Sequence, residues 1–154
     1  MKIIFLDFDG VICTQRAHIA FGKTQCWHAL DPVAVRMVEK ICEETGAKIV
    51  CSSTWGSMFG KPATQVALTV LGFSKEHFHK DWLTPKKLTS YRSNEIGWWL
   101  GEHEEVEKWV ALDDEFVDET IDPKLRGKWI ECPIEDGITA HNYRESVTHL
   151  GEEE

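Results

Sequence analysis

Two carboxylates, Asp7 and Asp9, follow the first apolar run of the chain, and Gly10 comes directly after them. Five of the six residues at 3–8 are apolar and β-prone, which predicts a strand buried on both faces of a sheet. Side chains two residues apart leave the same face of a strand, so these carboxylates repel each other unless a cation lies between them. Ligands in open α/β sheets collect at the carboxyl ends of strands, so the pattern predicts a metal-assisted site. The alternative for this motif alone is an Asp-Gly turn with one capping carboxylate.

Two further strand ends carry polar side chains that suit the same site. Ser52 and Ser53 follow a second apolar run, and Asp113 and Asp114 follow a third. Parallel strands bring their carboxyl ends to one edge of a sheet, so we expect these groups beside Asp7. Taken alone, the serines are better explained by a turn or a helix cap.

Three basic residues precede a helix that is expected between Ser53 and Asp113 in the sequence. Lys86, Lys87 and Arg92 lie just before its start at about Ser93. Positive charge at a helix amino terminus opposes the helix dipole, so an anionic partner would explain the placement, although solvated surface lysines explain at least one of the three. Asp118, further along the chain, is within reach of the acidic pair if a helical turn intervenes.

The elements that position these groups follow an α/β pattern. Asp31 as N-cap, Pro32 at the first helical position and Gly46 as the stop predict a helix between the first two strands, hence a β-α-β unit and a parallel sheet. Residues 13–30 show no sustained period, so we expect a loop or short hairpin there, a flap beside the site. Other helices are expected at 62–71, from about 93 and at 139–150, and strands at 47–51, 79–83 (an edge strand), 109–112 and 128–132.

Length and composition are those of a globular protein. The 154 residues suffice for one domain over 1–154, with a substantial core and an acidic, frayed tail at 151–154. The net charge of −9 disfavours extended nucleic-acid binding and raises the need for a cation if the substrate is anionic. The five cysteines are odd in number and lack C-x-x-C spacing, which indicates reduced thiols in a cytosolic protein. No apolar run is long enough to span a membrane, so we expect a soluble, cytoplasmic protein.

The order of the motifs resembles the haloacid dehalogenase-like (HAD) superfamily of phosphohydrolases. A strand-end D-x-D, a strand-end serine, a basic residue at a helix start and a strand-end Asp-Asp pair follow one another between Ile3 and about Leu125. The resemblance implies a three-layer Rossmann-like sandwich with a central parallel sheet. Cap domains of this family are inserted after the first or second motif. Because 13–30 and 56–85 are both short, we expect no large cap domain, and hence a small-cap or capless member with an open site.

A finer resemblance is to the RNA-repair-like and polynucleotide-end phosphatases of the superfamily. It rests on the segment from Ser52 to Trp55, the helix at Arg92 and the residues 137–139. It implies a phosphorylated substrate of nucleotide type.

The resemblance implies a role for each acidic residue. Asp7 matches the nucleophile and Asp9 the general acid/base. The expected metal is Mg²⁺, held by Asp7, the backbone carbonyl of Asp9 and the acidic pair Asp113 and Asp114, with Asp118 as the spaced third carboxylate of some members.

The phosphate-binding groups also follow from the resemblance. Ser52, with Ser53 beside it, matches the hydroxyl that holds a phosphoryl oxygen. The basic position is open between Arg92, Lys86 and Lys87, and Arg92 is favoured because it lies immediately at the helix.

These residues predict a magnesium-dependent phosphomonoesterase that acts through an aspartyl-phosphate. Asp at position 9 argues for hydrolysis, because a dehalogenase needs no acid there and pump-type members place Thr there. The expected substrate is a nucleotide or a nucleic-acid terminal phosphate. The alternatives are a phosphatase of small sugar or metabolite phosphates and a non-catalytic phosphate-binding module of the same fold.

Four aromatic or imidazole side chains lie within, or directly before, the short segments 13–30 and 56–85: Trp27, His28, Trp55 and Phe59. They would suit a small pocket for a base, with stacking from the neighbourhood of Trp27 or Trp55. Core packing of the tryptophans is an equally good explanation.

Overall fold

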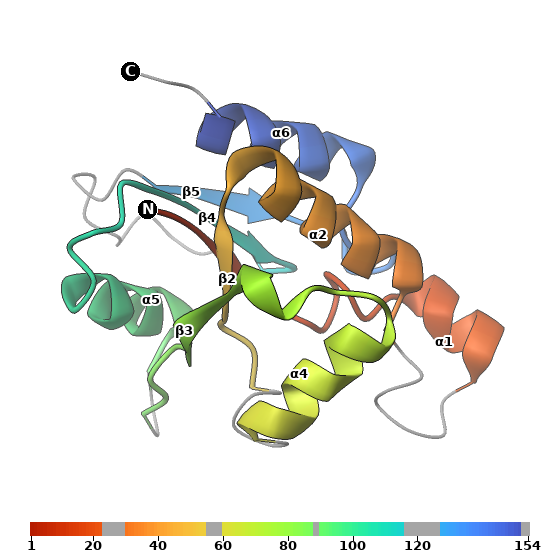
Figure 1. Ribbon diagram of the computed structural model, residues 1–154. Coiled ribbons are helices and arrows are strands. Elements are labelled where there is room, and N and C mark those ends of the chain that lie inside the picture. Colours follow the sequence, from red (N-terminus) through yellow and green to blue (C-terminus); the bar gives the residue numbers. More distant parts are fainter. Residues whose placement is uncertain (23–29, 55–59, 88–89, 116–126, 152–154) are drawn as a thin grey trace.

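Five parallel strands form one sheet at the centre of the molecule (Figure 1). The computed structural model describes residues 1–22, 30–54, 60–87, 90–115 and 127–151. The order across the sheet is β3-β2-β1-β4-β5, so β1 lies in the middle. The strands are β1 (Lys2–Leu6), β2 (Lys48–Cys51), β3 (Phe78–Leu83), β4 (Lys108–Asp113) and β5 (Gly127–Glu131).

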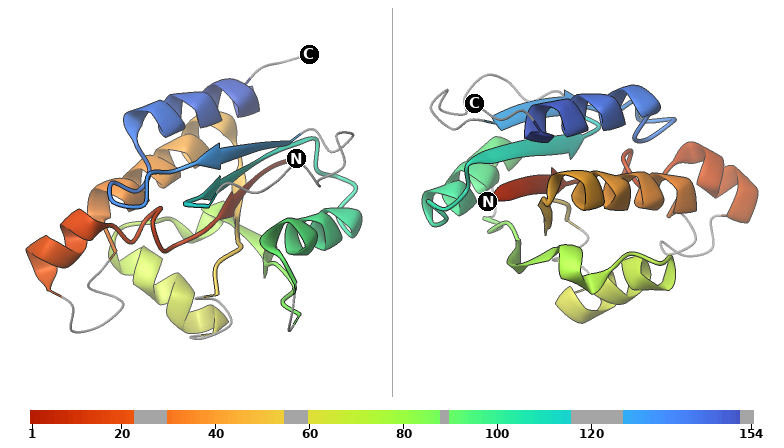
Figure 2. Two further views of the ribbon diagram at one scale, coloured as in Figure 1. Left: turned by 180° about the vertical axis from the view of Figure 1, so that it is seen from behind. Right: turned by 45° about the horizontal axis from the view of Figure 1, so that its top comes forward.

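Helices cover both faces of this sheet. α2 and α6 lie side by side on one face, and α5 lies on the other (Figures 1 and 2). The fold is therefore the three-layer, Rossmann-like α/β sandwich that was predicted, with no large cap domain among the described residues. The helices are α1 (Gln15–Phe21), α2 (Pro32–Thr45), α4 (Lys61–Val70), the 3₁₀ helix η2 (Lys75–His77), α5 (Arg92–Gly101) and α6 (Ala140–Gly151).

The central strand is buried on both faces, as its apolar run predicted. Ile4 and Leu6 belong to the core that β1 shares with α2, α4 and α6, while Ile3 and Phe5 belong to a second core beneath α5. The ring of Phe5 makes edge contacts with Trp99 of α5 at 5.4 Å. Because alternate side chains of β1 serve opposite layers, this strand holds the two helical layers together.

The predicted start and end of α2 are confirmed. Asp31 Oδ1 accepts hydrogen bonds from the backbone N–H groups of Val33 at 2.9 Å and Ala34 at 3.3 Å, which satisfies two donors of the first turn. Gly46 ends the helix in the left-handed region, with φ +73°.

The prediction for 13–30 was wrong in part. Residues 15–21 form a helix, α1, and Thr14 caps it by accepting a hydrogen bond from the backbone N–H of Ala17 at 3.2 Å. Only Ala17 of this helix is buried, so no apolar period marks it in the sequence. Residues 23–29 of the predicted flap lie outside the described residues, as do 152–154 of the predicted tail, whereas Gly151 is the last residue of α6.

None of the helices in the described part of the chain is long and apolar enough to cross a membrane. The four cysteines within this part, Cys13, Cys42, Cys51 and Cys132, are buried and form no disulfide. Cys26 lies outside it.

Candidate active site

The register of the three central strands brings Asp7, Ser52 and Asp113 to one edge of the sheet. Leu6 pairs with Cys51 on one side and with Leu112 on the other. Each of the three polar residues therefore follows a residue of the same paired row. The backbone N–H of Asp7 donates to Leu112 O, and that of Ser52 donates to Leu6 O, both at 3.0 Å. The ladder thus fixes the three positions through main-chain hydrogen bonds.

Three carboxylates meet at this edge. Asp7, Asp113 and Asp114 each offer an oxygen atom that lies within 4.8 Å of the others. Asp7 and Asp113 are buried, with 4% and 1% of their surface exposed, and Asp114 is partly exposed. Asp9 is exposed, and its carboxylate is not in this cluster.

Arg92 supplies a positive charge to the cluster. Its Nη1 lies 3.0 Å from Asp7 Oδ2 and 2.6 Å from Asp113 Oδ2, so a single nitrogen atom bridges two carboxylates. Arg92 is the first residue of α5, and α5 begins at the carboxyl edge of the sheet. Burial alone would lower the pKa of this guanidinium, but the charges of Asp7 and Asp113 outweigh burial and raise it. Arg92 therefore stays a cation.

The carboxylates hold more negative charge than Arg92 offsets. Burial raises the pKa of Asp7, more than the opposing charge of Arg92 lowers it. The pKa of Asp114 rises to about 7, chiefly through burial and then through its hydrogen bond with Asp113 and the charge of Asp7. Such shifts mark a site that disfavours three ionised carboxylates without a further cation. An all-oxygen donor set of this kind suits Mg²⁺.

Gly10 lets the first and last motifs approach each other. Its φ is +75°, and a Cβ atom built on it would lie 2.6 Å from Asp114 Cβ and 2.7 Å from Asp114 Oδ2. Any side chain at position 10 would therefore displace Asp114. Gly10 is therefore required here for two reasons, its positive φ and its close approach to Asp114, and the sequence did not show the second.

We expect Gly10→Ala to weaken Mg²⁺ binding as well as stability, because Ala collides with Asp114 and is strained at positive φ. Mg²⁺ titration followed by the thermal melting temperature measures both effects. Gly46→Ala is the matched control: its φ is +73°, but nothing lies within 4 Å of an added Cβ. An equal loss of Mg²⁺ response in both variants would contradict the role of Gly10.

The two lysines do not reach the carboxylate cluster. Lys86 Nζ donates to Ser52 O at 2.7 Å and forms an ion pair with the buried Glu95. Lys87 Nζ lies over the ring of Trp98, 4.1 Å from its centroid. Of the three candidate basic residues, only Arg92 contacts the aspartates.

The structural role of Glu95 was not identified from the sequence. It is buried in α5 and accepts a hydrogen bond from Ser90 Oγ at 2.7 Å in addition to its ion pair with Lys86. It therefore holds the segment before α5 against the second strand end. The signal was a carboxylate at a core-facing position of an apolar helix, where a charge needs a partner.

Ser52 and Ser53 are both buried at the end of β2, and their phosphate-binding role stays a prediction. The predicted positions Asp118, Trp27, His28, Trp55 and Phe59 lie outside the described residues, so their roles stay predictions.

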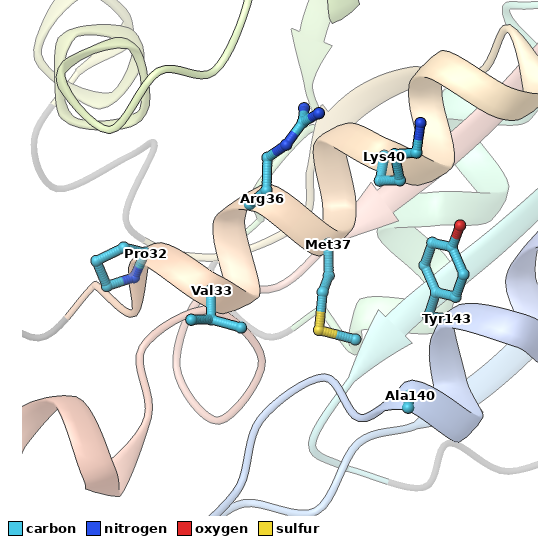
Figure 3. A pocket seen from close by; sticks show the side chains of 7 residues that line it. All are labelled: Pro32, Val33, Arg36, Met37, Lys40, Ala140 and Tyr143. Atoms are coloured by element: carbon cyan, nitrogen blue, oxygen red, sulfur yellow. The ribbon is translucent and has the colours of Figure 1, made fainter.

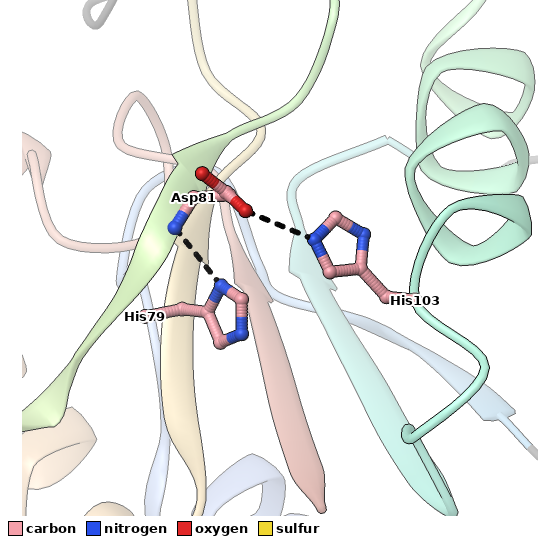
Figure 4. Close-up of side chains that lie close together, drawn as sticks. All are labelled: His79, Asp81 and His103. Carbon is pink, nitrogen blue, oxygen red and sulfur yellow. Dashed lines mark hydrogen bonds and ion pairs between the residues drawn. The ribbon is translucent and has the colours of Figure 1, made fainter.

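A second cluster, His79, Asp81 and His103, also brings possible ligand atoms together (Figure 4). The backbone N–H of Asp81 donates to His79 Nδ1 at 3.1 Å, so the lone pair of that nitrogen is already used. His103 Nδ1 lies 2.6 Å from Trp99 O, and its Nε2 lies 3.3 Å from Asp81 Oδ2. The His103 ring also stacks on Trp99 at 3.7 Å. We interpret this cluster as packing between β3 and the end of α5.

A groove of about 460 Å³ lies between α2 and α6 (Figure 3). It contains none of the strand-end residues, and its basic residues Arg36 and Lys40 are paired with Glu43. It is therefore separate from the candidate site. Its lining is Pro32, Val33, Arg36, Met37, Lys40, Ala140 and Tyr143.

A parallel α/β sandwich with clustered aspartates, a serine and an arginine at its carboxyl edge is the arrangement of a HAD-like protein. The family model for the HAD domain in Swiss Army Knife RNA repair proteins matches residues 3–143. The chain belongs to this family, which confirms the resemblance to the RNA-repair-like branch. Neither the curated proteins nor the solved structures gave a match to the chain.

Proposed function

We propose that the protein is a magnesium-dependent phosphomonoesterase that acts through an aspartyl-phosphate on Asp7. The observation that carries the proposal is the meeting of Asp7, Asp113 and Asp114 with Arg92 at the strand ends. Membership of the HAD family supports a hydrolase or phosphatase class. A phosphate-binding module would need no second, exposed aspartate beside the buried one, so Asp9 favours an enzyme.

The chain's own residues have separate tasks in this reaction. Asp7 attacks phosphorus in line, the bond from phosphorus to the leaving oxygen breaks, and Asp9 gives that oxygen a proton. Asp9 then takes a proton from the water that hydrolyses the aspartyl-phosphate. Arg92 offsets negative charge on the phosphoryl oxygens, and the Ser52 hydroxyl donates a hydrogen bond to one of them.

The burial of Asp7 and the exposure of Asp9 suit these tasks. A nucleophile benefits from being held in one position by Arg92 and the strand ladder. An acid/base has to reach both the leaving group and water, which an exposed carboxylate can do.

Asp7, Asp113 and Asp114 would hold Mg²⁺, together with the backbone carbonyl of Asp9. When bound, the ion neutralises charge on the phosphoryl group and lets it approach the anionic nucleophile.

The proposed substrate is a nucleotide-type monophosphate, either free or at a nucleic-acid end. The family description names RNA repair proteins, which supports a nucleic-acid end. The net charge of −9 argues against contact with a long strand, because such contact depends on many neutralised phosphates. Contact with the terminal nucleotides satisfies both observations.

We expect phosphate release from a small aryl phosphate to require Mg²⁺ and to stop in excess chelator. Release of inorganic phosphate, measured with and without added Mg²⁺, checks this. Restoring Mg²⁺ after chelation controls for loss of folded protein. Hydrolysis that continues undiminished in chelator would reject the metal assignment.

A further inference from the structure

The outward face of α5 carries two exposed aromatic residues. Tyr91, the residue at the N-cap position of the helix, is 77% exposed, and Trp98 is 39% exposed. Asn94 between them is also exposed. The spacing of i, i+3 and i+7 places all three on one side of the helix. We call Tyr91, Asn94 and Trp98 the α5 ridge.

The ridge is joined directly to the candidate active site through two pairs of consecutive residues. Tyr91 precedes Arg92, whose guanidinium contacts Asp7 and Asp113. Lys87, which lies over the Trp98 ring, follows Lys86, which bonds Ser52 O. In each pair one residue faces the strand ends and its neighbour belongs to, or contacts, the ridge.

The segment that carries Lys87 is fixed to α5. Lys87 N donates to Ser90 Oγ at 3.1 Å, and Ser90 Oγ donates to the buried Glu95 at 2.7 Å. Glu95 also pairs with Lys86. These contacts hold the α5 ridge in a fixed position beside the strand-end site. A substrate that contacts both would require such a fixed position.

The local chemistry differs from that of the whole chain. The net charge is −9, yet the ridge combines two aromatic rings with the ammonium group of Lys87, close to Lys86 and Arg92. Aromatic rings combined with cations are the means by which proteins hold single-stranded nucleic acid.

We propose that the α5 ridge binds the end of a single-stranded nucleic acid whose terminal phosphate lies in the site. The Tyr91 ring stacks on the base of the terminal nucleotide. Lys87, positioned by Trp98, meets the next phosphodiester. This rests on the proposed function for the position of the terminal phosphate.

The spacing favours an extended strand, with one base on the Tyr91 ring and the next phosphodiester at Lys87, which lies over Trp98. Tyr91 is the N-cap residue of α5 and Trp98 lies seven residues further on, which places them about 10 Å apart along the helix axis. That distance exceeds the step of about 3.4 Å between stacked bases in a duplex. The preferred substrate is therefore a single-stranded end of at least two nucleotides, and a free mononucleotide uses only the Tyr91 part.

The first test compares a dinucleotide that carries a terminal phosphate with the same molecule lacking the terminal base, for both the 5′ and the 3′ phosphate. The ratio to be measured is kcat/KM for the dinucleotide divided by kcat/KM for the molecule without the terminal base. We expect Tyr91→Ala to lower this ratio by roughly 10- to 100-fold, the range for loss of one stacked base. Tyr91→Phe keeps the ring and should keep the ratio. An unchanged ratio in Tyr91→Ala would overturn the proposal.

The second test concerns Lys87 and Trp98. Lys87→Ala and Trp98→Ala should each remove the preference for the phosphorylated dinucleotide over the mononucleotide. In binding measurements, each should also reduce the slope of log affinity against log salt by about 0.7, the value for one lost phosphate contact on a single strand. Lys75→Ala, which removes a positive charge from η2, is the matched control and should leave both quantities unchanged. Equal effects of all three variants would show that Lys87 does not contact the next phosphodiester.

Binding to the Asp7→Asn protein separates this proposal from the enzymatic one, because it needs no turnover. Fluorescence anisotropy of a labelled phosphorylated dinucleotide should show Tyr91-dependent binding. If no substrate releases phosphate but this binding persists, the proposed function fails and the ridge stands. If Tyr91→Ala lowers the affinity for a labelled phosphoserine peptide as much as the affinity for the dinucleotide, the ridge is a peptide site and base stacking is rejected.

Discussion

Asp7→Asn is expected to lower kcat by roughly 10⁴-fold or more, because the amide keeps the shape of the carboxylate but cannot form the aspartyl-phosphate. The fold should persist. Asp7 lies at 3.0 Å from Arg92, which retains Asp113 as a partner after the change. Removing one of three crowded carboxylates also lowers their mutual repulsion. Steady-state phosphate release and thermal melting without metal measure the two effects.

Asp9→Asn is the matched comparison, since it makes the same chemical change two residues away at an exposed position. It removes proton transfer and leaves the nucleophile, so we expect a smaller loss, of about 10²-fold or more. Incubation with substrate followed by acid quenching should trap phosphate on Asp9→Asn and none on Asp7→Asn. Near-normal turnover by a folded Asp7→Asn protein would show that the covalent mechanism is wrong.

Arg92→Ala is expected to lower both activity and stability. Its Nη1 is the nitrogen that bridges Asp7 and Asp113, so its loss removes a positive charge opposite the phosphoryl oxygens and should cost about 10²- to 10³-fold in kcat. The two buried carboxylates also lose their counter-ion, at a cost of about 3 kcal/mol in the free energy of unfolding. Mg²⁺ should restore part of that stability, because it binds the folded cluster and not the unfolded chain. Chemical denaturation with and without Mg²⁺ measures this.

Two variants sharpen the test of Arg92. Arg92→Lys should retain much of the activity, since one nitrogen atom makes both contacts and an ammonium group can replace it. Lys86→Ala should lower stability because it leaves the buried Glu95 without its ion-pair partner, but Mg²⁺ should not compensate for that loss. A larger fall in kcat for Lys86→Ala than for Arg92→Ala would assign the phosphate-binding role to the lysine.

The strand ends were predictable because register follows from simple rules. A buried apolar run that stops at a carboxylate predicts the carboxyl end of a parallel strand, and parallel pairing then places Asp7, Ser52 and Asp113 along one edge. The cap at Asp31 and the stop at Gly46 predicted α2 for a similar reason, because both act through their own local backbone.

The choice among Arg92, Lys86 and Lys87 needed the structure. All three precede the same helix, and only the tertiary contacts with Glu95, Trp98 and the aspartates separate them. The contact of Gly10 with Asp114 joins residues about a hundred positions apart, so no local pattern contains it. α1 was missed because a surface helix with one buried residue has no apolar period.

The central position of β1 has a consequence for how the chain reaches its native state. β1 is synthesised before both of its neighbours in the sheet, and one of these neighbours is β4, at residues 108–113. The edge of β1 that pairs with β4 therefore has no partner until β2, β3 and α5 have been synthesised. Contacts of such long sequence separation slow folding, and an unpaired apolar strand invites aggregation on the ribosome. We therefore expect the central part of the sheet to form only after β4 has been synthesised.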